Sequence, residues 1–147
     1  MALRAFAETD LAPLADLWVA TWSETGFAID FEARRSWLED HLRRLRAEGA
    51  AIVVGIDARG RPSGFVAFDP KNGVLDQLCV APVERGSGLA TVLLDEAKRC
   101  SPGAVELDVN EGNARARRFY AREGFAVVGR GVSAASGLPT LKMRWTA

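Results

Sequence analysis

Hydrophobic residues recur along this chain at two spacings, one typical of helices and one typical of strands. Leu11, Leu14, Ala15, Trp18 and Trp22 return every three to four residues, which predicts a helix with one buried face. The same spacing predicts helices over residues 31–47, 88–100 and 114–123. Short apolar runs bounded by turn residues predict strands over residues 2–7, 51–57, 63–69, 74–81, 105–110, 125–131 and 139–145.

Glycine, proline and short polar residues separate these elements. Thr9 or Asp10 can cap the first helix, because either side chain accepts a hydrogen bond from a free backbone N–H. Gly49 is expected to end the second helix, and residues 58–62 and 70–73 predict turns between strands. The resulting order, β-α-α-β-β-β-α-β-α-β-β, predicts an α/β fold in which helices cover the faces of a sheet.

Composition limits the class of protein. The 147 residues suffice for one domain, and no linker or repeat divides them, so we expect a single domain over residues 1–147. A formal charge of zero argues against a general nucleic-acid binder. The apolar run over residues 50–56 is too short to span a membrane, and the N-terminus lacks a signal-peptide pattern, which favours the cytoplasm. Cys79 and Cys100 show no metal-ligand spacing, so no metal is expected.

A glycine-rich turn follows the strand predicted over residues 74–81 and reads Arg85-Gly86-Ser87-Gly88-Leu89-Ala90. Its glycines permit unusual dihedral angles and a close approach to the backbone. The free N–H groups and the dipole of the helix that starts here favour an anion. The turn therefore predicts a phosphate or pyrophosphate site. It lacks a Walker lysine and the longer G-x-G-x-x-G pattern, which argues against kinases and dinucleotide-binding domains.

A second motif runs from Asn113 to Phe125 and reads N-A-R-A-R-R-F-Y-A-R-E-G-F. The two motifs, with Leu78, Val80 and Pro82 before the first, resemble those of the GNAT superfamily of acyl-CoA-dependent N-acyltransferases. The resemblance covers roughly residues 75–129. It implies an α/β, single-domain GNAT-like fold with a mixed central sheet of about six to seven strands and about four flanking helices. It also implies acetyl-CoA as the co-substrate.

The resemblance implies a location for coenzyme A. The strand over residues 78–80 would pair with the pantetheine arm, and the N–H groups of residues 86–91 would hold the pyrophosphate. Asn113 would bind the arm, cap its helix, or do both. The arginines of that helix offer a partner for the 3′-phosphate, although a solvated helix face explains them equally well. The implied cofactor-binding set is Leu78, Cys79, Val80, Arg85, Gly86, Ser87, Gly88, Leu89, Ala90, Thr91, Asn113, Ala116 and Arg117.

Tyr120, the only tyrosine of the chain, is the candidate general acid that protonates the departing thiolate. The alternative is that its hydroxyl is satisfied inside a packed core. Asp108 is the favoured general base. Asp76 or Gln77 is an alternative, and strand alternation should place these two on opposite faces; a water network without a dedicated base is another. Cys79 is not expected to be a nucleophile, because strand cysteines usually pack as small hydrophobes.

The acceptor is predicted to be a primary amine, either of a small molecule or of a protein N-terminus or lysine. The first two helices, their loop and the C-terminal hairpin should form its pocket. Glu24, Asp30 and Glu32 could attract a cationic amine, whereas the lone His41 receives no role. The aromatic residues of the same segment line the pocket or belong to the core; they are Trp22, Phe27, Phe31 and Trp37. A homodimer is possible. The alternative function is a non-catalytic acyl-CoA-binding domain.

Overall fold

The computed structural model describes residues 2–147, whose elements follow the predicted order. The strands are β1 (Ala2–Ala5), β2 (Ala51–Ile56), β3 (Pro62–Phe68), β4 (Leu75–Val80), β5 (Ala104–Asn110), β6 (Ala126–Val132) and β7 (Pro139–Thr146). The α-helices are α1 (Leu11–Ser23), α2 (Arg35–Ala47), α3 (Leu89–Cys100) and α4 (Ala114–Arg122). Short 3-10 turns occupy Glu8–Asp10, Glu32–Arg34 and Pro82–Glu84. The predicted elements are therefore present, with boundaries shifted by a few residues.

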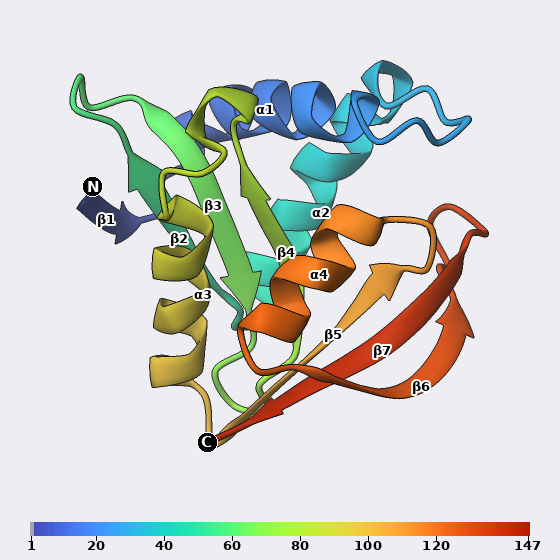
Figure 1. Ribbon diagram of the computed structural model, residues 1–147. Coiled ribbons are helices and arrows are strands. Elements are labelled where there is room, and N and C mark those ends of the chain that lie inside the picture. The colour runs from blue at the N-terminus through green and yellow to red at the C-terminus, as the bar shows by residue number, and fades with distance from the viewer. Residues whose placement is uncertain (1) are drawn as a thin grey trace.

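The strands form two antiparallel sheets, where the sequence led us to expect one continuous sheet. The first has the order β1-β2-β3-β4 and the second the order β5-β7-β6. They meet at one point, where Val74 bridges Glu106 and the Glu106 N–H donates to the Gly73 carbonyl at 2.9 Å. From there β4 and β5 run apart without pairing (Figure 1). The facing edges of these two strands are consequently open.

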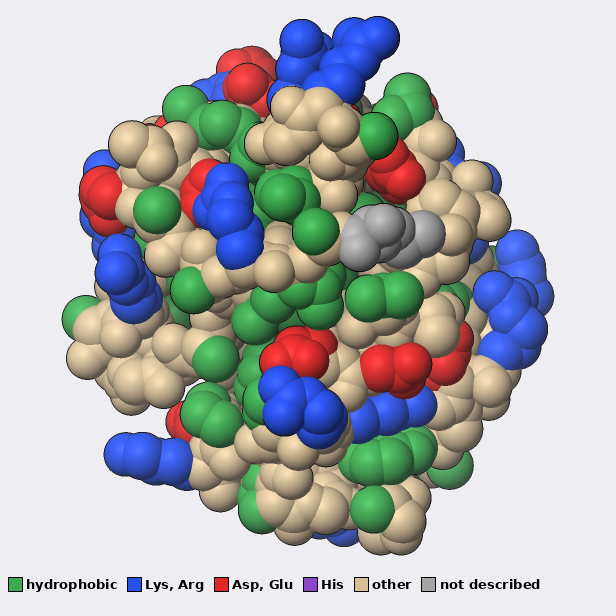
Figure 2. Space-filling model, turned by 90° about the vertical axis from the view of Figure 1, so that its left-hand side faces the viewer, with side chains coloured by type: hydrophobic (Ala, Val, Ile, Leu, Met, Phe, Trp, Pro, Cys, Tyr) green, Lys and Arg blue, Asp and Glu red, His purple; other side chains and the backbone are tan. Residues whose placement is uncertain are grey.

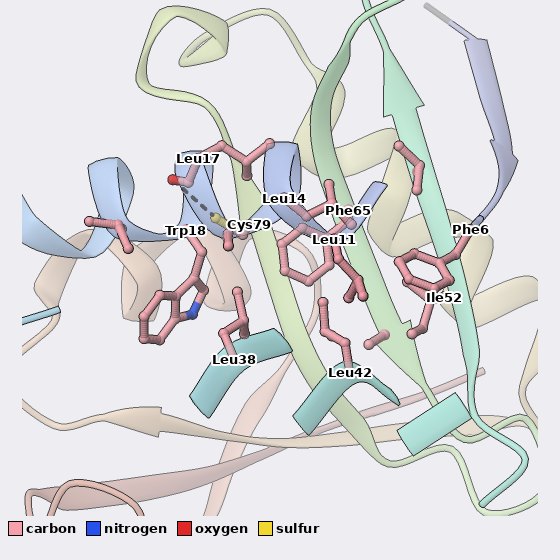
Figure 3. Close-up of a cluster of buried hydrophobic side chains, with 14 of the residues drawn as sticks. Phe6, Leu11, Leu14, Leu17, Trp18, Leu38, Leu42, Ile52, Phe65 and Cys79 are labelled. Carbon is pink, nitrogen blue, oxygen red and sulfur yellow. Dashed lines mark hydrogen bonds between the residues drawn. The ribbon is translucent and has the colours of Figure 1, made fainter. Parts of the chain in front are cut away.

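Two hydrophobic clusters lie on opposite faces of the first sheet. One is formed by α1 and α2 against that sheet and contains Leu14, Leu38, Leu42 and Phe65, all fully buried (Figure 3). The other joins α3, α4 and both sheets. Apolar residues of α1 and α2 at helical spacing supply the first cluster, as their spacing predicts. The helices thus fix both sides of β4, the strand that borders the open edge.

The start of α3 packs directly on the first sheet. Leu89, its first residue, is fully buried. A Cβ at Gly55 would lie 2.8 Å from Leu89 Cδ1, and one at Gly64 would lie 3.1 Å from Leu89 Cδ2. The sheet can approach Leu89 this closely because both positions lack a side chain. This contact fixes the beginning of α3 beside the end of β4.

Asp10 stands at the N-cap position of α1, as expected, but its carboxylate points away from the helix. Its oxygens accept two hydrogen bonds from the Arg4 guanidinium, at 2.7 and 2.8 Å, and one from the Ala7 N–H at 2.8 Å. The bond from Arg4 lowers the pKa of this buried carboxyl. The predicted cap is therefore replaced by a link between β1 and the start of α1.

The surface around β1 carries charges of both signs. In Figure 2, which looks at this side of the molecule, acidic and basic side chains alternate with apolar ones. This face holds no large patch of a single charge, in keeping with the formal net charge of zero. Across residues 2–147, no helix combines the length and the hydrophobicity that a membrane crossing requires.

Candidate active site

The turn before α3 leaves several backbone N–H groups free. Gly86 and Gly88 adopt positive φ values of 80° and 89°, which glycine accommodates without strain. Ser87 closes the turn, since its N–H donates to the Glu84 carbonyl at 3.0 Å. Within residues 2–147, the N–H groups of the turn that donate to no protein acceptor are those of Gly86, Gly88, Ala90 and Thr91. We call these four groups the N–H cradle; together with the helix dipole they favour an anion.

The open edge of β4 lies beside this cradle. The Ala81 N–H donates to the Ser63 carbonyl at 2.8 Å, so alternation directs the backbone of Cys79 toward β3 and that of Leu78 and Val80 toward the open edge. The Val80 carbonyl accepts a hydrogen bond from Thr21 Oγ1 at 2.9 Å. Among the three predicted strand residues, Leu78 and Val80 thus present backbone groups to the space between the sheets.

Tyr120 lies on α4 and is 8% exposed. Its ring packs edge-on against Phe119 and Phe125, with centroid distances of 5.3 and 5.5 Å. Among the hydrogen bonds of residues 2–147, none involves its hydroxyl. The alternative expectation, a hydroxyl that is hydrogen-bonded inside the core, therefore does not fit this structure. Burial raises the pKa of Tyr120 above its ordinary value, and the nearby Cys79 adds to this rise. The side chain is therefore a protonated donor at neutral pH.

Cys79 is buried on the opposite side of β4, with its Sγ 3.9 Å from the Leu17 carbonyl of α1 (Figure 3). Burial raises the pKa of this thiol to about 12. The thiolate is therefore scarce at neutral pH. This environment agrees with the expectation that Cys79 does not act as a nucleophile.

We expect Cys79 of the native protein to resist iodoacetamide at pH 8, because a pKa of about 12 leaves on the order of one thiol in ten thousand ionised. Cys100 is only partly buried and serves as the internal control. Peptide mass spectrometry after short labelling should find Cys100 modified well before Cys79, and unfolding should make both react. Equal labelling rates in the native protein would contradict the buried position of Cys79.

Asp108 lies on β5 with its side chain 58% exposed. Its Oδ1 is 3.5 Å from Lys142 Nζ on β7. Its neighbours Leu107 and Val109 are buried in the cluster that contains Tyr120, so alternation places Asp108 on the other face of β5. The structure therefore sets this predicted base and the predicted acid on opposite sides of the strand.

Asp76 and Gln77 lie at a β-bulge, and the prediction that they occupy opposite faces is wrong. The β3–β4 register pairs Ala67 with Gln77 but Phe68 with Leu75, so Asp76 is an extra residue without a partner. Gln77 Nε2 lies 3.4 Å from Asp76 Oδ1, and His41 Nε2 of α2 lies 2.6 Å from the same oxygen. Both side chains consequently reach the α2 side of the sheet. No sequence signal pointed to His41, because 35 residues separate it from Asp76.

Three of the remaining predicted cofactor-binding side chains make contacts within the protein. Arg85 forms an ion pair with Glu24, with 2.5 Å between Nη2 and Oε2, so Glu24 is not the free carboxylate expected for attracting an amine. Asn113 caps α4, because its Oδ1 accepts a hydrogen bond from the Ala116 N–H at 3.2 Å. The Arg117 guanidinium donates to the Glu111 carbonyl at 3.1 Å. The side chains of Arg85, Asn113 and Arg117 therefore all have protein partners already.

Two contacts join the elements that the sequence led us to expect around an acceptor pocket. A Cβ at Gly112 would lie 3.1 Å from the ring of Phe27, so the α1–α2 loop packs against the β5–α4 loop. Arg34 Nη1 donates to the Ala135 carbonyl of the β6–β7 loop at 2.6 Å. The expected pocket elements thus meet. Phe31 is buried in the first cluster, whereas Trp37 remains partly exposed.

Fold and site together define a class of α/β domain, in which an anion-binding turn adjoins the open edge of a splayed sheet. A family model described as the acetyltransferase (GNAT) domain matches residues 23–147. The chain therefore belongs to the GNAT acetyltransferase family, which confirms the family and the fold class predicted from the motifs. Membership makes acetyl transfer the general class of reaction. Over residues 2–147, no group of three or more His, Cys, Asp or Glu side chains could hold a metal ion.

Relatives support the same family. The peptidyl-lysine N-acetyltransferase YjaB of Escherichia coli is 35% identical over 96 residues, which cover 65% of this chain and 63% of the E. coli protein. YjaB of Salmonella typhimurium is 32% identical over 76% of this chain and 77% of its own length. The solution structure of apo YjaB from E. coli superposes with a TM-score of 0.79 at 28% identity, over 98% of this chain and 96% of that one.

The PaiA N-acetyltransferase of Thermoplasma acidophilum shares the fold, with a TM-score of 0.79 at 18% identity over 99% of this chain and 98% of that one. Its structure was determined in complex with coenzyme A. At this identity the likeness shows the fold alone.

Proposed function

We propose that this protein transfers an acetyl group from acetyl-CoA to a primary amine by direct attack within a ternary complex. The observation that carries the proposal is the N–H cradle beside the open edge of β4. A pyrophosphate needs several N–H donors at one place, and the cradle supplies them without any protein acceptor competing within the described residues. Residues 1–147 would act as one acetyltransferase domain.

The residues around the cradle fit the other parts of coenzyme A. The outward-facing backbone groups of Leu78 and the Val80 N–H can pair with the amides of the pantetheine arm as an added strand would, whereas the Val80 carbonyl already accepts a hydrogen bond from Thr21 Oγ1. Ser87 holds the turn in place, because its Oγ accepts a hydrogen bond from the Leu89 N–H, and Asn113 caps the start of α4. Arg85 and Arg117 would have to exchange or share their present partners to bind phosphate.

The chemistry requires three proton transfers. The acceptor arrives as an ammonium and gives one proton to a carboxylate or to water. Its lone pair then attacks the thioester carbon, the C–S bond breaks, and the thiolate takes a proton from Tyr120. The new amide nitrogen then loses its surplus proton, and a proton returns to the Tyr120 phenolate through solvent. Holding both substrates together supplies much of the acceleration.

Two carboxylates are candidates for the first proton transfer. Asp108, the base favoured by the sequence, is exposed on the face of β5 away from Tyr120 and interacts with Lys142. Asp76 lies at the β4 bulge on the α2 side. An amine that enters from the side of α2 would therefore meet carboxylates on its way to the thioester. Comparing Asp108→Asn with Asp76→Asn separates the two.

A lysine side chain is the acceptor we favour. The YjaB relatives are named peptidyl-lysine N-acetyltransferases, and a lysine ammonium on a flexible stem can enter a space closed by the α1–α2 and β6–β7 loops. Small primary amines belong to the same chemical class. They would be the acceptors instead if the space between the two loops is too narrow for a peptide.

The test combines acetyl-CoA binding, measured by calorimetry, with thiol release in the presence of lysine peptides and small amines. Gly86→Ala should weaken acetyl-CoA binding about tenfold or more, because a positive φ strains alanine and reorients the cradle. Gly60→Ala is the matched control: Gly60 has a φ of 78° against 80° at Gly86, and neither position has a neighbour within 4 Å of an added Cβ.

We expect the wild type and Gly60→Ala to bind acetyl-CoA alike and to acetylate at least one amine. Acetyl-CoA binding without turnover on any amine would favour the non-catalytic acyl-CoA-binding domain instead. Equal binding by Gly86→Ala and Gly60→Ala would show that the N–H cradle does not hold the cofactor.

A further inference from the structure

His41 is the only histidine of the chain, and its ring is almost enclosed, with 9% of the side chain exposed. It stacks on Trp37, with ring centroids 4.6 Å apart and planes inclined by 13°. Two charged groups lie within hydrogen-bonding distance of its nitrogens: Asp76 from β4, on Nε2, and Arg44 from α2, on Nδ1. The ring therefore connects α2 to the bulge of β4.

The chemistry of these partners fixes the tautomer of His41. The Arg44 guanidinium has only donors, so Nδ1, which lies 2.8 Å from its Nη2, must be the unprotonated nitrogen. The single N–H of the neutral ring then sits on Nε2 and donates to Asp76 Oδ1 at 2.6 Å. Because both nitrogens are engaged, His41 itself has no free nitrogen with which to accept the proton of an amine.

Asp76 is the extra residue of the bulge, so no residue of β3 lies opposite it. Its Oδ1 is taken by His41 and approached by Gln77 Nε2 at 3.4 Å. Among the hydrogen bonds of residues 2–147, none ends on Oδ2, and 31% of the side chain is exposed. His41 thus determines which carboxylate oxygen remains available.

We propose that His41 is a positioning residue, which holds Asp76 through the Nε2–H bond and leaves Oδ2 to bind the acceptor ammonium and take its proton. This role rests on the proposed N-acetyltransferase function. In the step itself, the ammonium N–H bond breaks, the proton passes to Asp76 Oδ2, and the lone pair remains on the amine nitrogen. Arg44 keeps Nδ1 unprotonated, so His41 stays a donor throughout.

The first test reads His41 directly. Since the chain has one histidine, ¹⁵N-histidine labelling gives a single imidazole in the NMR spectrum. We expect the proton on Nε2, and we expect Arg44→Gln to alter the Nδ1 signal while Arg43→Gln does not. Arg43 is the matched control, because it lies next to Arg44 on α2 but bonds to Glu8 and Asp40. A proton on Nδ1 in the wild type would overturn the proposal.

The second test measures function. His41→Leu should lower kcat about 10- to 100-fold with little change in the KM for acetyl-CoA, because a loosely held Asp76 meets the amine in the wrong geometry. His41→Gln keeps an N–H donor near the position of Nε2 and should recover most of the activity. Thermal unfolding of both variants controls for folding. A folded His41→Leu variant with kcat within about twofold of wild type would overturn the proposal.

Titration of labelled protein with Nα-acetyllysine amide separates this proposal from the proposed function. The Nε2 signal should move in the wild type and stay fixed in Asp76→Asn. If no amine is acetylated but the signal still moves in this way, the transferase fails while the His41–Asp76 site for an ammonium stands. If the signal ignores the amine, the proposal for His41 fails, whether or not acetyl transfer is observed.

Discussion

Tyr120→Phe should lower kcat about 100-fold or more, which is the usual contribution of a general acid. The substitution removes only the hydroxyl that we propose to protonate the thiolate. Acetyl-CoA affinity should change little, because the cradle and the open edge of β4 lie elsewhere. The unfolding temperature should also change little, since the hydroxyl has no hydrogen-bond partner within the described residues. Steady-state kinetics, calorimetry and thermal unfolding measure the three quantities.

The pH profile sharpens this test. Burial raises the pKa of Tyr120, so the acid form persists to a higher pH than that of a free tyrosine, which ionises near about 10. The wild type should therefore lose no activity through tyrosine ionisation below about pH 10. A variant that keeps more than a third of wild-type turnover would remove Tyr120 from the mechanism, and the thiolate would then leave without a protein acid.

Gly73→Ala should destabilise the protein by about 3 kcal/mol, as the sum of backbone strain and a lost hydrogen bond. Gly73 has a φ of 75°, and an added Cβ would lie 2.1 Å from the Ala104 carbonyl oxygen. That oxygen is a backbone atom, so it cannot avoid the clash by a change of side-chain rotamer. The clash would force β4 and β5 apart where the Glu106 N–H now donates to the Gly73 carbonyl.

Urea unfolding followed by circular dichroism measures this loss, again with Gly60→Ala as the control. Its φ of 78° imposes similar strain, but its Cβ would enter open space, so about 1 kcal/mol is expected. Equal losses in the two variants would show that the sheets do not depend on the contact at Gly73. A large loss of unfolding free energy for Gly73→Ala alone would confirm that the contact at Gly73 connects the two sheets.

Features set by near neighbours in the chain could be read from the sequence. The turn at Gly86 and Gly88 and the cap that Asn113 gives to α4 depend on residues within a few positions. Amphipathic spacing likewise predicted the helices, because burial of one face is a property of the local pattern. For the same reason the sequence motifs describe the part of the site that we propose for the cofactor.

Features that depend on a distant partner could not be predicted. The bulge at Asp76 depends on its register with β3, and strict alternation therefore gave the wrong face for one of its residues. The ion pair of Arg85 with Glu24 and the bond between His41 and Asp76 join residues on different elements. The division into two sheets likewise depends on where β4 stops pairing, which no local pattern encodes.

The close packing of Leu89 against Gly55 and Gly64 has a consequence for the energetics of cofactor binding. It anchors the first turn of α3 through the core, so the N–H cradle takes shape as the protein folds rather than when its ligand arrives. The conformational entropy of ordering this turn is then lost during folding, and association needs no rearrangement there. Enlarging either glycine would shift that loss onto the binding step, so a residue that never touches the ligand would change its affinity.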